Sequence, residues 1–383
     1  MTRYVLRRLV QIIITFFLFQ TLTFFLLYAQ PGDIANQYLL NPNLPPDAAE
    51  QLRKELGLDK PPHLQYIQYM KNFLTGNLGV SFTNYPRPVI DIIKERLPRT
   101  LVLFFTATVI SFYVGFALGK LLAWKRGGLF EYATTVVGVT LYTVFTPWFA
   151  LMMIWLFAYK WNLFPTGKFI TPTLWRNTPF TANDVFLRMI WTGVWGGVVA
   201  VAAYLLFRRL PPPYRFFSGF LALFVGIIAA VIPWIHSPMA RYALDILWHM
   251  ILPIATLTLI SFAGTMLLTR NSLLETMRED YILAARAKGL PEKVVRDKHA
   301  ARTALLPVVT SLVFSLAFAI DGGVITETMF SWPGMGLTLL NAVVQEDIPL
   351  AMGAFSFTGM LALLAHLAAD LLYAYLDPRI RYS

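Results

Sequence analysis

The sequence contains a series of apolar blocks that are long enough to cross a lipid bilayer. A transmembrane helix needs about 20 consecutive, mainly apolar residues, and inside a bilayer only helices and closed barrels satisfy their own backbone groups. Eight blocks reach that length, at residues 9–29, 100–122, 133–158, 187–207, 216–235, 247–268, 305–326 and 350–375. The sequence therefore predicts an all-α polytopic membrane protein with eight spans.

The composition agrees with a membrane protein and excludes several other classes. The chain is 57% hydrophobic and 14% charged, whereas soluble domains are about 25% charged. The formal charge of +11 is better explained by basic loops against an anionic cytoplasmic leaflet than by nucleic acid. Because the chain has no cysteine, disulfides, thiolate chemistry and cysteine-based metal sites are excluded.

The distribution of Lys and Arg predicts the orientation of the chain. With the N-terminus inside, the inner segments hold 19 of the 32 basic residues and the outer segments hold 13, mostly in the long segment 30–99. Both termini are therefore predicted to be cytoplasmic. The first apolar block follows Arg7 and Arg8 and is longer than the apolar core of a signal peptide, so we interpret it as a retained span.

Two regions between the spans need separate interpretations. In the segment 30–99 we expect short helices, one from Asp47 to Leu56 and one in the aromatic stretch that follows. The fourth and fifth spans are separated by a short basic turn with three prolines, 211–213, which is typical of a tight inner hairpin. A re-entrant or externally packed pair of helices is the alternative for these two blocks.

The inner loop between residues 270 and 304 carries the most informative pattern. Asp280 is placed to cap a short helix that ends at Gly289, and Pro291 suits the first turn of a second helix. Ala284 and Ala285 are small, so another protein can approach this helix closely. On these grounds alone, an ordinary solvated basic loop is the alternative.

The loop resembles the EAA loop of permeases of ATP-binding-cassette (ABC) importers, in the dipeptide, oligopeptide and nickel branch. The resemblance rests on 280–290, and it extends to the first subunit of that branch through an ordered series of motifs over roughly 1–165 and 245–383. These motifs are Arg3–Leu9, Pro31–Asp33, Leu56–Pro61, Gly76–Ser81, Arg96–Thr100, Glu327–Gly336, Asp370–Tyr373 and Leu376–Arg381.

The resemblance implies a function and a set of partners. It implies a six-helix type I importer core in a prokaryotic cell membrane, paired with a second homologous permease, two cytoplasmic ATP-binding subunits and an extracytoplasmic substrate-binding protein. ATP and Mg²⁺ would be bound by those partners, and this chain contains no Gly-x-x-x-x-Gly-Lys-Ser/Thr phosphate loop. The residues expected to contact the ATPase are Asp280, Tyr281, Ala284, Ala285, Arg286, Lys288 and Gly289.

Three departures from the family pattern qualify the resemblance. Leu283 replaces the glutamate that names the loop, so no salt bridge carries over to that position. The stretch from Gly289 to Pro307 is longer than in permeases generally, although that length is usual in the peptide branch. About 170–244 has no counterpart in the six-span plan. We therefore predict five consecutive regions. They are a first helix, 1–29; an extracytoplasmic segment, 30–99; two spans, 100–165; an inserted region, 166–246; and a core region, 247–383.

Four polar residues near the later spans are candidates for the pathway or for structure. Charged groups at membrane depth normally face a cavity or a partner. Asp321 lies inside the seventh block, and it either lines the pathway or makes a structural contact. Glu327 either caps the turn 331–336 or binds substrate. His366 and Asp370 lie four residues apart, so they either pair with each other or face the pathway. The five histidines show no metal-ligand spacing.

Other functions remain as alternatives. An ion-gradient-driven secondary transporter would need clustered midplane charges and two related halves, of which the sequence shows neither. A membrane-embedded enzyme would need a nucleophile or metal motif, and neither a Gly-x-Ser-x-Gly nor a His-Glu-x-x-His pattern occurs. Within the importer class, the substrates could be dipeptides, oligopeptides, oligosaccharides or nickel chelates.

Overall fold

The structure is a computed structural model that describes residues 2–28, 60–125, 127–209, 217–319 and 322–376. The described residues are predominantly helical, and their only β pairing is an isolated bridge between Val80 and Pro88. The chain divides into a larger unit, residues 1–153 with 253–383, and a smaller unit, residues 154–252. The predicted helix from Asp47 to Leu56 lies outside the described residues.

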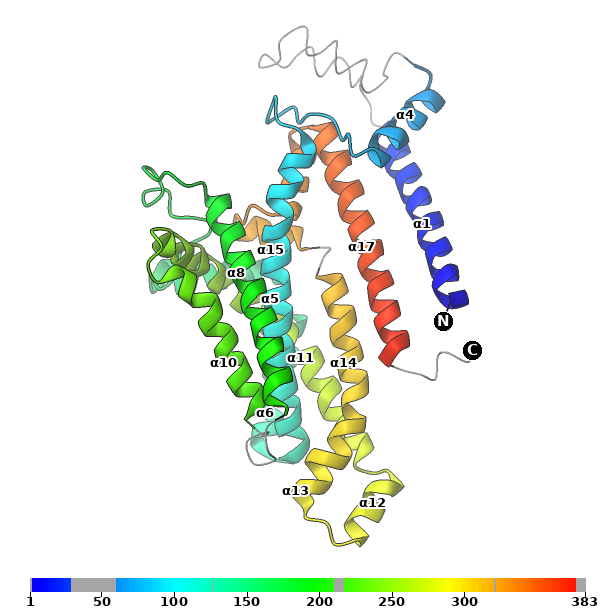
Figure 1. Cartoon of the computed structure of the whole chain (residues 1–383), viewed down its shortest axis with the longest axis vertical. Coiled ribbons are helices and arrows are strands. Elements are labelled where there is room, and N and C mark those ends of the chain that lie inside the picture. The colour runs from blue at the N-terminus through cyan, green and yellow to red at the C-terminus, as the bar shows by residue number, and fades with distance from the viewer. Residues whose placement is uncertain (1, 29–59, 126, 210–216, 320–321, 377–383) are drawn as a thin grey trace. The chain divides into compact units, whose positions relative to one another are not determined.

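The larger unit holds most of the helices (Figure 1). They are α1 (Thr2–Tyr28), α4 (Pro62–Leu74), α5 (Val89–Trp124), α6 (Leu129–Thr143), α7 (Thr146–Met153), α12 (Asp280–Ala287), α13 (Glu292–Val294), the π-helix η3 (Val295–Ala300), α14 (Ala301–Phe318), α15 (Val324–Met329), α16 (Met335–Val344) and α17 (Ile348–Leu376). The smaller unit holds the π-helix η1 (Ile154–Lys160), α8 (Ala182–Phe207), α10 (Ser218–Val231) and the 3₁₀ turn η2 (Ile232–Trp234). Helix α11 (Ala240–Thr276) contributes its first part to the smaller unit and the rest to the larger.

Six helices in the described part of the chain are long and apolar enough to span a membrane. They are Leu6–Phe25 within α1, α5, α8, α11, Glu292–Phe318 and Ile348–Leu372 within α17. A polytopic membrane protein is thereby confirmed. The predicted third and fifth spans do not form single long helices, so the number of eight stays a prediction.

The predicted third span, 133–158, is not one straight helix. It is divided between α6 and the pair α7–η1, which are bent by 108° relative to each other. The chain between them leaves the helical conformation at Val144, which is extended, and Pro147 in the first turn of α7 has no N–H to continue the hydrogen-bond ladder. The apolar composition of this block predicted a membrane span. The position of Pro147 accounts for the bend within it.

The boundaries of two other spans differ from the prediction. Helix α5 begins at Val89, well before the predicted start at residue 100, and it continues through the internal Pro98. Helix α14 ends at Phe318, before the predicted end at residue 326, and Gly322 has a positive φ of 68° that a helix cannot accommodate.

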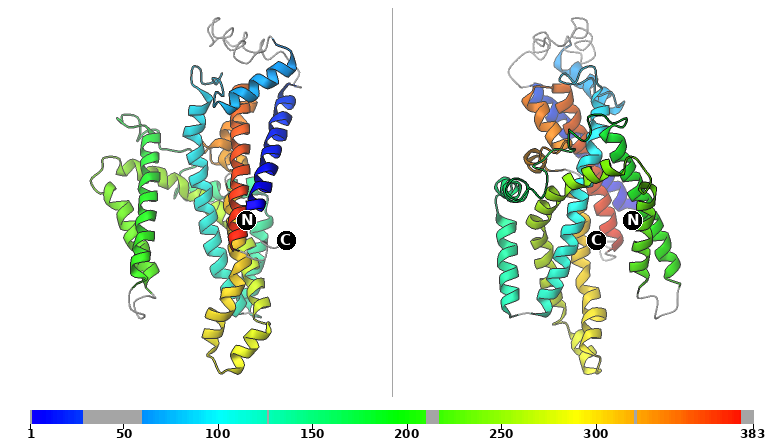
Figure 2. Two further views of the ribbon diagram at one scale, coloured as in Figure 1. Left: turned by 45° about the vertical axis from the view of Figure 1, so that its right-hand side comes forward. Right: turned by 90° about the vertical axis from the view of Figure 1, so that its left-hand side faces the viewer.

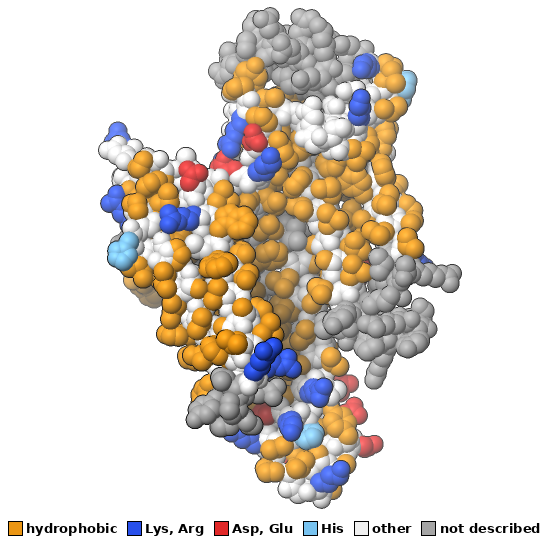
Figure 3. Space-filling model, viewed as in Figure 1, with side chains coloured by type: hydrophobic (Ala, Val, Ile, Leu, Met, Phe, Trp, Pro, Cys, Tyr) orange, Lys and Arg blue, Asp and Glu red, His pale blue; other side chains and the backbone are white. Residues whose placement is uncertain are grey.

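The two ends of the larger unit differ in what they carry. The views in Figures 1 and 2 agree that α4 lies at one end and that α12 and α13 lie at the opposite end. On the face shown in Figure 3, hydrophobic side chains cover the middle, and charged side chains gather toward the ends. Near the α4 end, a core cluster joins α5, α16 and α17; its buried members are Val89, Ile92, Ile93, Met335, Ala342, Leu350, Ala351 and Ala354.

A hydrogen-bonded triangle joins α1 and α17 to α4. The Tyr69 hydroxyl lies 2.7 Å from both the Gln20 Oε1 and the Ser356 Oγ, and Ser356 also donates to Gln20 at 2.7 Å. Gln20 and Ser356 are fully buried, and burial raises the pKa of Tyr69 to about 12. The phenol therefore stays neutral, and it holds α4 against two membrane-spanning helices.

In the smaller unit, α8 and α10 pack with their backbones in close approach. A Cβ added at Gly196 would lie 2.6 Å from the Gly226 carbonyl oxygen, and one at Gly226 would lie 2.5 Å from the Ala200 Cβ. Small residues at such a seam let two membrane helices gain dispersion contacts that larger side chains would prevent. The basic, proline-rich turn between these helices lies outside the described residues except for its first two arginines.

The seam of small residues yields a stability prediction. Gly196→Ala places a methyl group against the α10 backbone, so we expect the free energy of unfolding to fall by about 1–3 kcal/mol. The matched control is Gly197→Ala, where no atom lies within 4 Å of an added Cβ. Thermal unfolding of both variants in detergent measures the difference. Equal stability of the two variants would contradict the close packing of α8 on α10.

Candidate functional site

The loop 270–304, predicted to be an inner loop, begins as a continuation of α11 and then folds into a compact helical unit. Helix α12 starts at Asp280, and Glu279 occupies the N-cap position without a side-chain capping bond. The prediction that Asp280 caps this helix is therefore wrong by one residue. The prediction for Gly289 is confirmed, because its φ of +72° is in the left-handed region that ends a helix. Pro291 directly precedes α13, which leads through η3 into α14.

Helix α12 has one face packed inward and one face exposed. Ile282 and Ala285 are buried in a cluster with Val295 and Ala300 of η3. The predicted contact residues that are exposed are Asp280, Tyr281, Ala284, Arg286, Lys288 and Gly289. Ala285 was predicted to contact an ATPase, but its side chain is only 7% exposed and supports the inside of the loop.

Exposed apolar groups extend the outer face of α12. Leu283 is 54% exposed and Tyr281 is 42% exposed, although the rest of the loop is rich in charge. Leu283 was noted in the sequence only as a missing glutamate. Two large apolar side chains beside the exposed Ala284 form a surface suited to a protein partner.

An ion pair links the two helices of the loop. Arg286 donates to the Glu292 carboxylate from Nε at 3.1 Å and from an Nη at 2.7 Å. This bidentate geometry raises the pKa of the Arg286 guanidinium, whose hydrogen bonds to Glu292 favour its charged form. The pair is exposed to solvent, so its main effect is to orient α12 relative to the start of α13.

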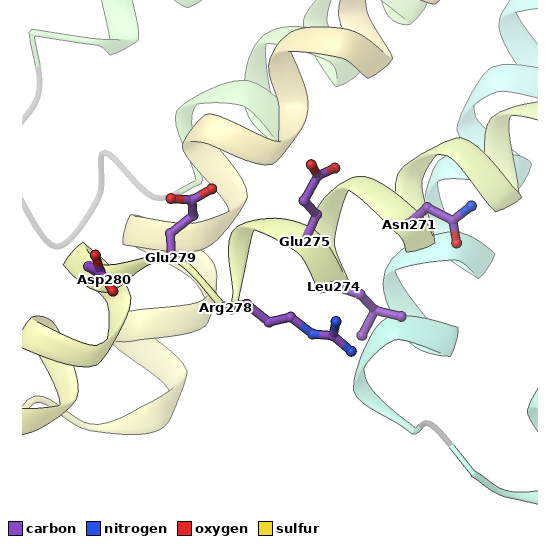
Figure 4. A pocket seen from close by; sticks show the side chains of 6 residues that line it. All are labelled: Asn271, Leu274, Glu275, Arg278, Glu279 and Asp280. Atoms are coloured by element: carbon purple, nitrogen blue, oxygen red, sulfur yellow. The ribbon is translucent and has the colours of Figure 1, made fainter.

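A hollow of about 440 Å³ lies where α11 meets α12 (Figure 4). Its lining residues are Asn271, Leu274, Glu275, Arg278, Glu279 and Asp280. In Figure 4 the carboxylates of Glu275 and Glu279 extend to one side of the ribbon, and the Arg278 side chain extends to another. The rim of this hollow therefore offers carboxylates to a basic partner surface.

Two contacts fix the base of the loop. Arg270, near the C-terminal end of α11, pairs with Glu131 of α6, with its Nε 2.8 Å from the carboxylate. Ser272 donates to the Ala304 carbonyl oxygen at 2.8 Å. This bond joins helix α11, which enters the loop, to helix α14, which leaves it. The loop is thus held firmly where it meets the membrane-spanning helices.

Glu327 of α15 is fully buried beside the turn that leads from α15 to α16. Its Oε1 accepts a hydrogen bond from the Thr100 hydroxyl at 2.7 Å, and its Oε2 accepts one from the Leu337 backbone N–H at 2.9 Å. Leu337 is in the first turn of α16, where unpaired N–H groups and the helix dipole favour an anion. Of the two roles considered for Glu327, these hydrogen bonds are those of a structural cap rather than of a substrate-binding group. Asp321 lies outside the described residues.

His366 and Asp370 do not form the expected pair. The Asp370 carboxylate lies 3.3 Å from an Nη of Arg8 on α1, and the His366 Nδ1 lies 2.8 Å from the Ala362 carbonyl oxygen of its own helix. The His366 ring also packs edge-on against Phe318. The spacing of four residues brings two side chains to one face of α17, but the nearest opposite charge belongs to a neighbouring helix. No cluster of three metal-ligating side chains occurs among the described residues.

Asp347 is a buried acid that the sequence analysis did not single out. Its carboxylate accepts from the Ser81 hydroxyl at 2.5 Å, from both the hydroxyl and the N–H of Thr83, and from the Leu350 N–H at 3.2 Å. The bond to Leu350 makes Asp347 the N-cap of α17, which the position of an Asp before an apolar run could have indicated. Asp347 therefore anchors the stretch 79–88 to the start of α17.

The turn at Glu327 yields a second prediction. The Thr100 Oγ1 donates to Glu327 and accepts from the Met335 N–H at 2.7 Å, so Thr100→Val leaves two buried polar groups with a lost partner. We expect a loss of about 1–3 kcal/mol in the free energy of unfolding, measured by thermal unfolding in detergent. Thr100→Ser keeps the hydroxyl and is the control. Comparable stability of the valine and serine variants would contradict this role of the hydroxyl.

Two family models match consecutive parts of the chain and together cover most of it. Residues 115–382 match the family described as "Binding-protein-dependent transport system inner membrane component". Residues 1–104 match the corresponding N-terminal family, "Binding-prot-dependent transport system membrane comp, N-term". Together with the six candidate spans, these matches make the chain a multi-pass inner-membrane protein.

Individual relatives match over the whole of both chains. The dipeptide transport system permease protein DppB of Escherichia coli (strain K12) is 32% identical, and the di/tripeptide transport system permease protein DppB of Pseudomonas aeruginosa (strain UCBPP-PA14) is 31% identical. The oligopeptide transport system permease protein AppB of Bacillus subtilis (strain 168) is 28% identical. The chain therefore belongs to the inner-membrane permease components of binding-protein-dependent transport systems.

Proposed function

We propose that this chain is one of two permease subunits of an ABC importer for peptides or similar solutes. With a second homologous permease it forms the pathway, and an extracytoplasmic binding protein delivers the solute. Two cytoplasmic subunits bind ATP and Mg²⁺ and hydrolyse the nucleotide, so this chain needs no cofactor of its own. The family description and the peptide-transport names of the relatives support this proposal.

The observation that carries the proposal is the division of α12 into two faces. Ile282 and Ala285 fix the helix to η3, while Leu283, Ala284 and Tyr281 face outward. A helix that is rigid on one side and small or apolar on the other can be moved as one body by a partner that contacts it. We infer that the ATPase subunit docks on this outward face, with Arg286 and Lys288 as electrostatic support.

The same proposal includes eight spans and cytoplasmic termini. Helix α8 is long enough to cross the membrane, and the stretch Ser218–Trp234 is shorter and apolar. Close packing of α8 on α10 supports a hairpin that crosses and returns. The excess of Lys and Arg in the inner segments supports the orientation. On this view the segment 166–246 is an addition to a six-span core.

Docking on α12 gives a third prediction. Ala284→Trp adds a large side chain to the exposed face, so we expect ATP-driven uptake of a labelled dipeptide by the assembled transporter in liposomes to fall by about tenfold. Because position 284 is exposed, the stability of the permease should not change.

Two controls sharpen this test. Ala284→Ser keeps a small side chain and should keep uptake. Ala285→Trp fills the inside of the loop and should lower stability as well as uptake, because position 285 is buried. Full uptake by Ala284→Trp would remove α12 from the ATPase contact.

The orientation gives a fourth prediction, which uses the absence of native cysteine. Single cysteines replacing Arg209 and Lys288 should react with an impermeant maleimide only from the cytoplasmic side. Cysteines replacing His63 and His236 should react only from the opposite side. All four positions are exposed in the structure. Labelling of positions 209 and 236 from the same side would show that α8 and α10 do not both cross the membrane.

A further inference from the structure

Helix α5 makes specific contacts with the inner loop at one end and with the α15–α16 turn at the other. The helix has 36 residues and runs along the larger unit in both Figure 1 and Figure 2. From Thr100 to Lys120 it extends for about 30 Å, at about 1.5 Å per residue, which is close to the thickness of the hydrocarbon core.

At the inner end of α5, the Arg296 side chain of the loop packs over the Trp124 ring. The Arg296 guanidinium carbon lies 3.7 Å from the centre of the Trp124 ring, and the Lys120 Nζ lies 4.4 Å from the same ring. Asp297 accepts from Arg296 at 3.1 Å and lies 3.6 Å from Lys120. We call Lys120, Trp124, Arg296 and Asp297 the inner contact. The geometry is that of a cation–π interaction within a small charge network.

The inner contact falls on the π-helix η3. Arg296 and Asp297 are the second and third residues of η3, and Val295 of the same segment packs on Ile282 and Ala285 of α12. Single turns of π-helix interrupt the regular ladder of an α-helix and are frequent at functional sites. A displacement of α12 therefore reaches η3 through packing and reaches α5 through Trp124.

Packing beside the inner contact prevents α5 from moving independently of α11 and α14. Ala123 is buried with Leu273 of α11 and Ala304 of α14. An added Cβ at Gly119 would lie 2.4 Å from the Met266 carbonyl oxygen, so α5 and α11 approach at backbone distance. Helix α5 is thus joined to both chain segments that enter and leave the loop.

At the outer end, α5 holds the turn between α15 and α16. Thr100 bonds to the Glu327 carboxylate and to the Met335 N–H, as described above. The Arg99 carbonyl oxygen accepts from the Trp332 indole N–H at 3.2 Å, and Trp332 is fully buried. We call Arg99, Thr100, Glu327, Trp332 and Met335 the outer contact. Any axial or rotational movement of α5 acts directly on this turn.

We propose that α5 transmits the movement of the docked α12 to the outer α15–α16 turn, with Trp124 as the positioning residue at the inner contact. This inference rests on the proposed function, because α12 must be moved by an ATPase. It assigns the route of coupling within this subunit. Trp124 contacts Arg296 of the loop and acts through the helix that carries it.

The experiment places a reporter at the C-terminal end of α16, the helix that follows the outer turn, in the assembled transporter in nanodiscs. The chain has no cysteine, and Gln345 at the end of α16 is exposed, so Gln345→Cys gives a single labelling site. The rate of maleimide labelling is compared between the nucleotide-free state and the state trapped with ATP and vanadate. ATP hydrolysis is measured in parallel, and no transported solute is needed.

Three tryptophan variants are compared in the reporter background, together with Ala284→Trp from the docking test. In Trp124→Leu we expect ATP hydrolysis within about twofold of the parent, while the trapping-dependent change in labelling rate shrinks by about tenfold. Trp124→Phe keeps an aromatic face for Arg296 and should restore the change. Trp191→Leu, which removes a 71% exposed tryptophan of α8, is the matched control and should behave as the parent.

The remaining outcomes overturn the proposal in distinguishable ways. If Trp124→Leu keeps the full labelling change while Ala284→Trp abolishes it, docking stands and the route through α5 is wrong. If Ala284→Trp also keeps the full change, the proposed docking on α12 falls together with this inference. Loss of hydrolysis in Trp124→Leu, or no restoration by phenylalanine, would reduce Trp124 to a structural role.

Discussion

Polar groups that enter a bilayer must find partners within the protein, and this requirement governs the structure from the backbone outward. It makes the chain helical, because a helix satisfies its own N–H and C=O groups. It also determines where buried side chains with charge are found. Glu327, Asp347 and Asp370 each accept hydrogen bonds or an ion pair from a different segment of the chain. These three carboxylates therefore connect segments of the larger unit that are far apart in the sequence.

These connections lie near the ends of the helices, where the chain changes direction. Asp347 joins the start of α17 to the stretch 79–88, and Arg270 joins the last turns of α11 to α6. Close packing of small residues adds to these connections, as at Gly115 and Gly119 toward the C-terminal end of α5, where α5 and α11 approach at backbone distance. Helices that are joined near their ends and packed at backbone distance are suited to move as whole bodies.

The sequence predicted those features that depend on composition and local pattern. Long apolar blocks predicted the helices, and the left-handed Gly289 ended α12 as expected. Features that depend on three-dimensional neighbours were harder to obtain. The partner of Asp370 is Arg8, more than 350 residues away in the sequence, so no local spacing indicates it. The inward orientation of Ala285 depends on the path of η3, a π-helix without a sequence signature. Pro147 is a signal for the break before α7, but it lies inside a long apolar block that predicted one continuous span.

The close seam between α8 and α10 has a consequence for how such a chain can grow. Because Gly196 and Gly226 approach each other at backbone distance, the two helices satisfy much of their packing within the pair itself. A pair of helices of this kind is stabilised mainly by the contacts between its own two members. It can be acquired between two existing spans without new complementary surfaces elsewhere, so the number of crossings can change while the translocating machinery keeps its design.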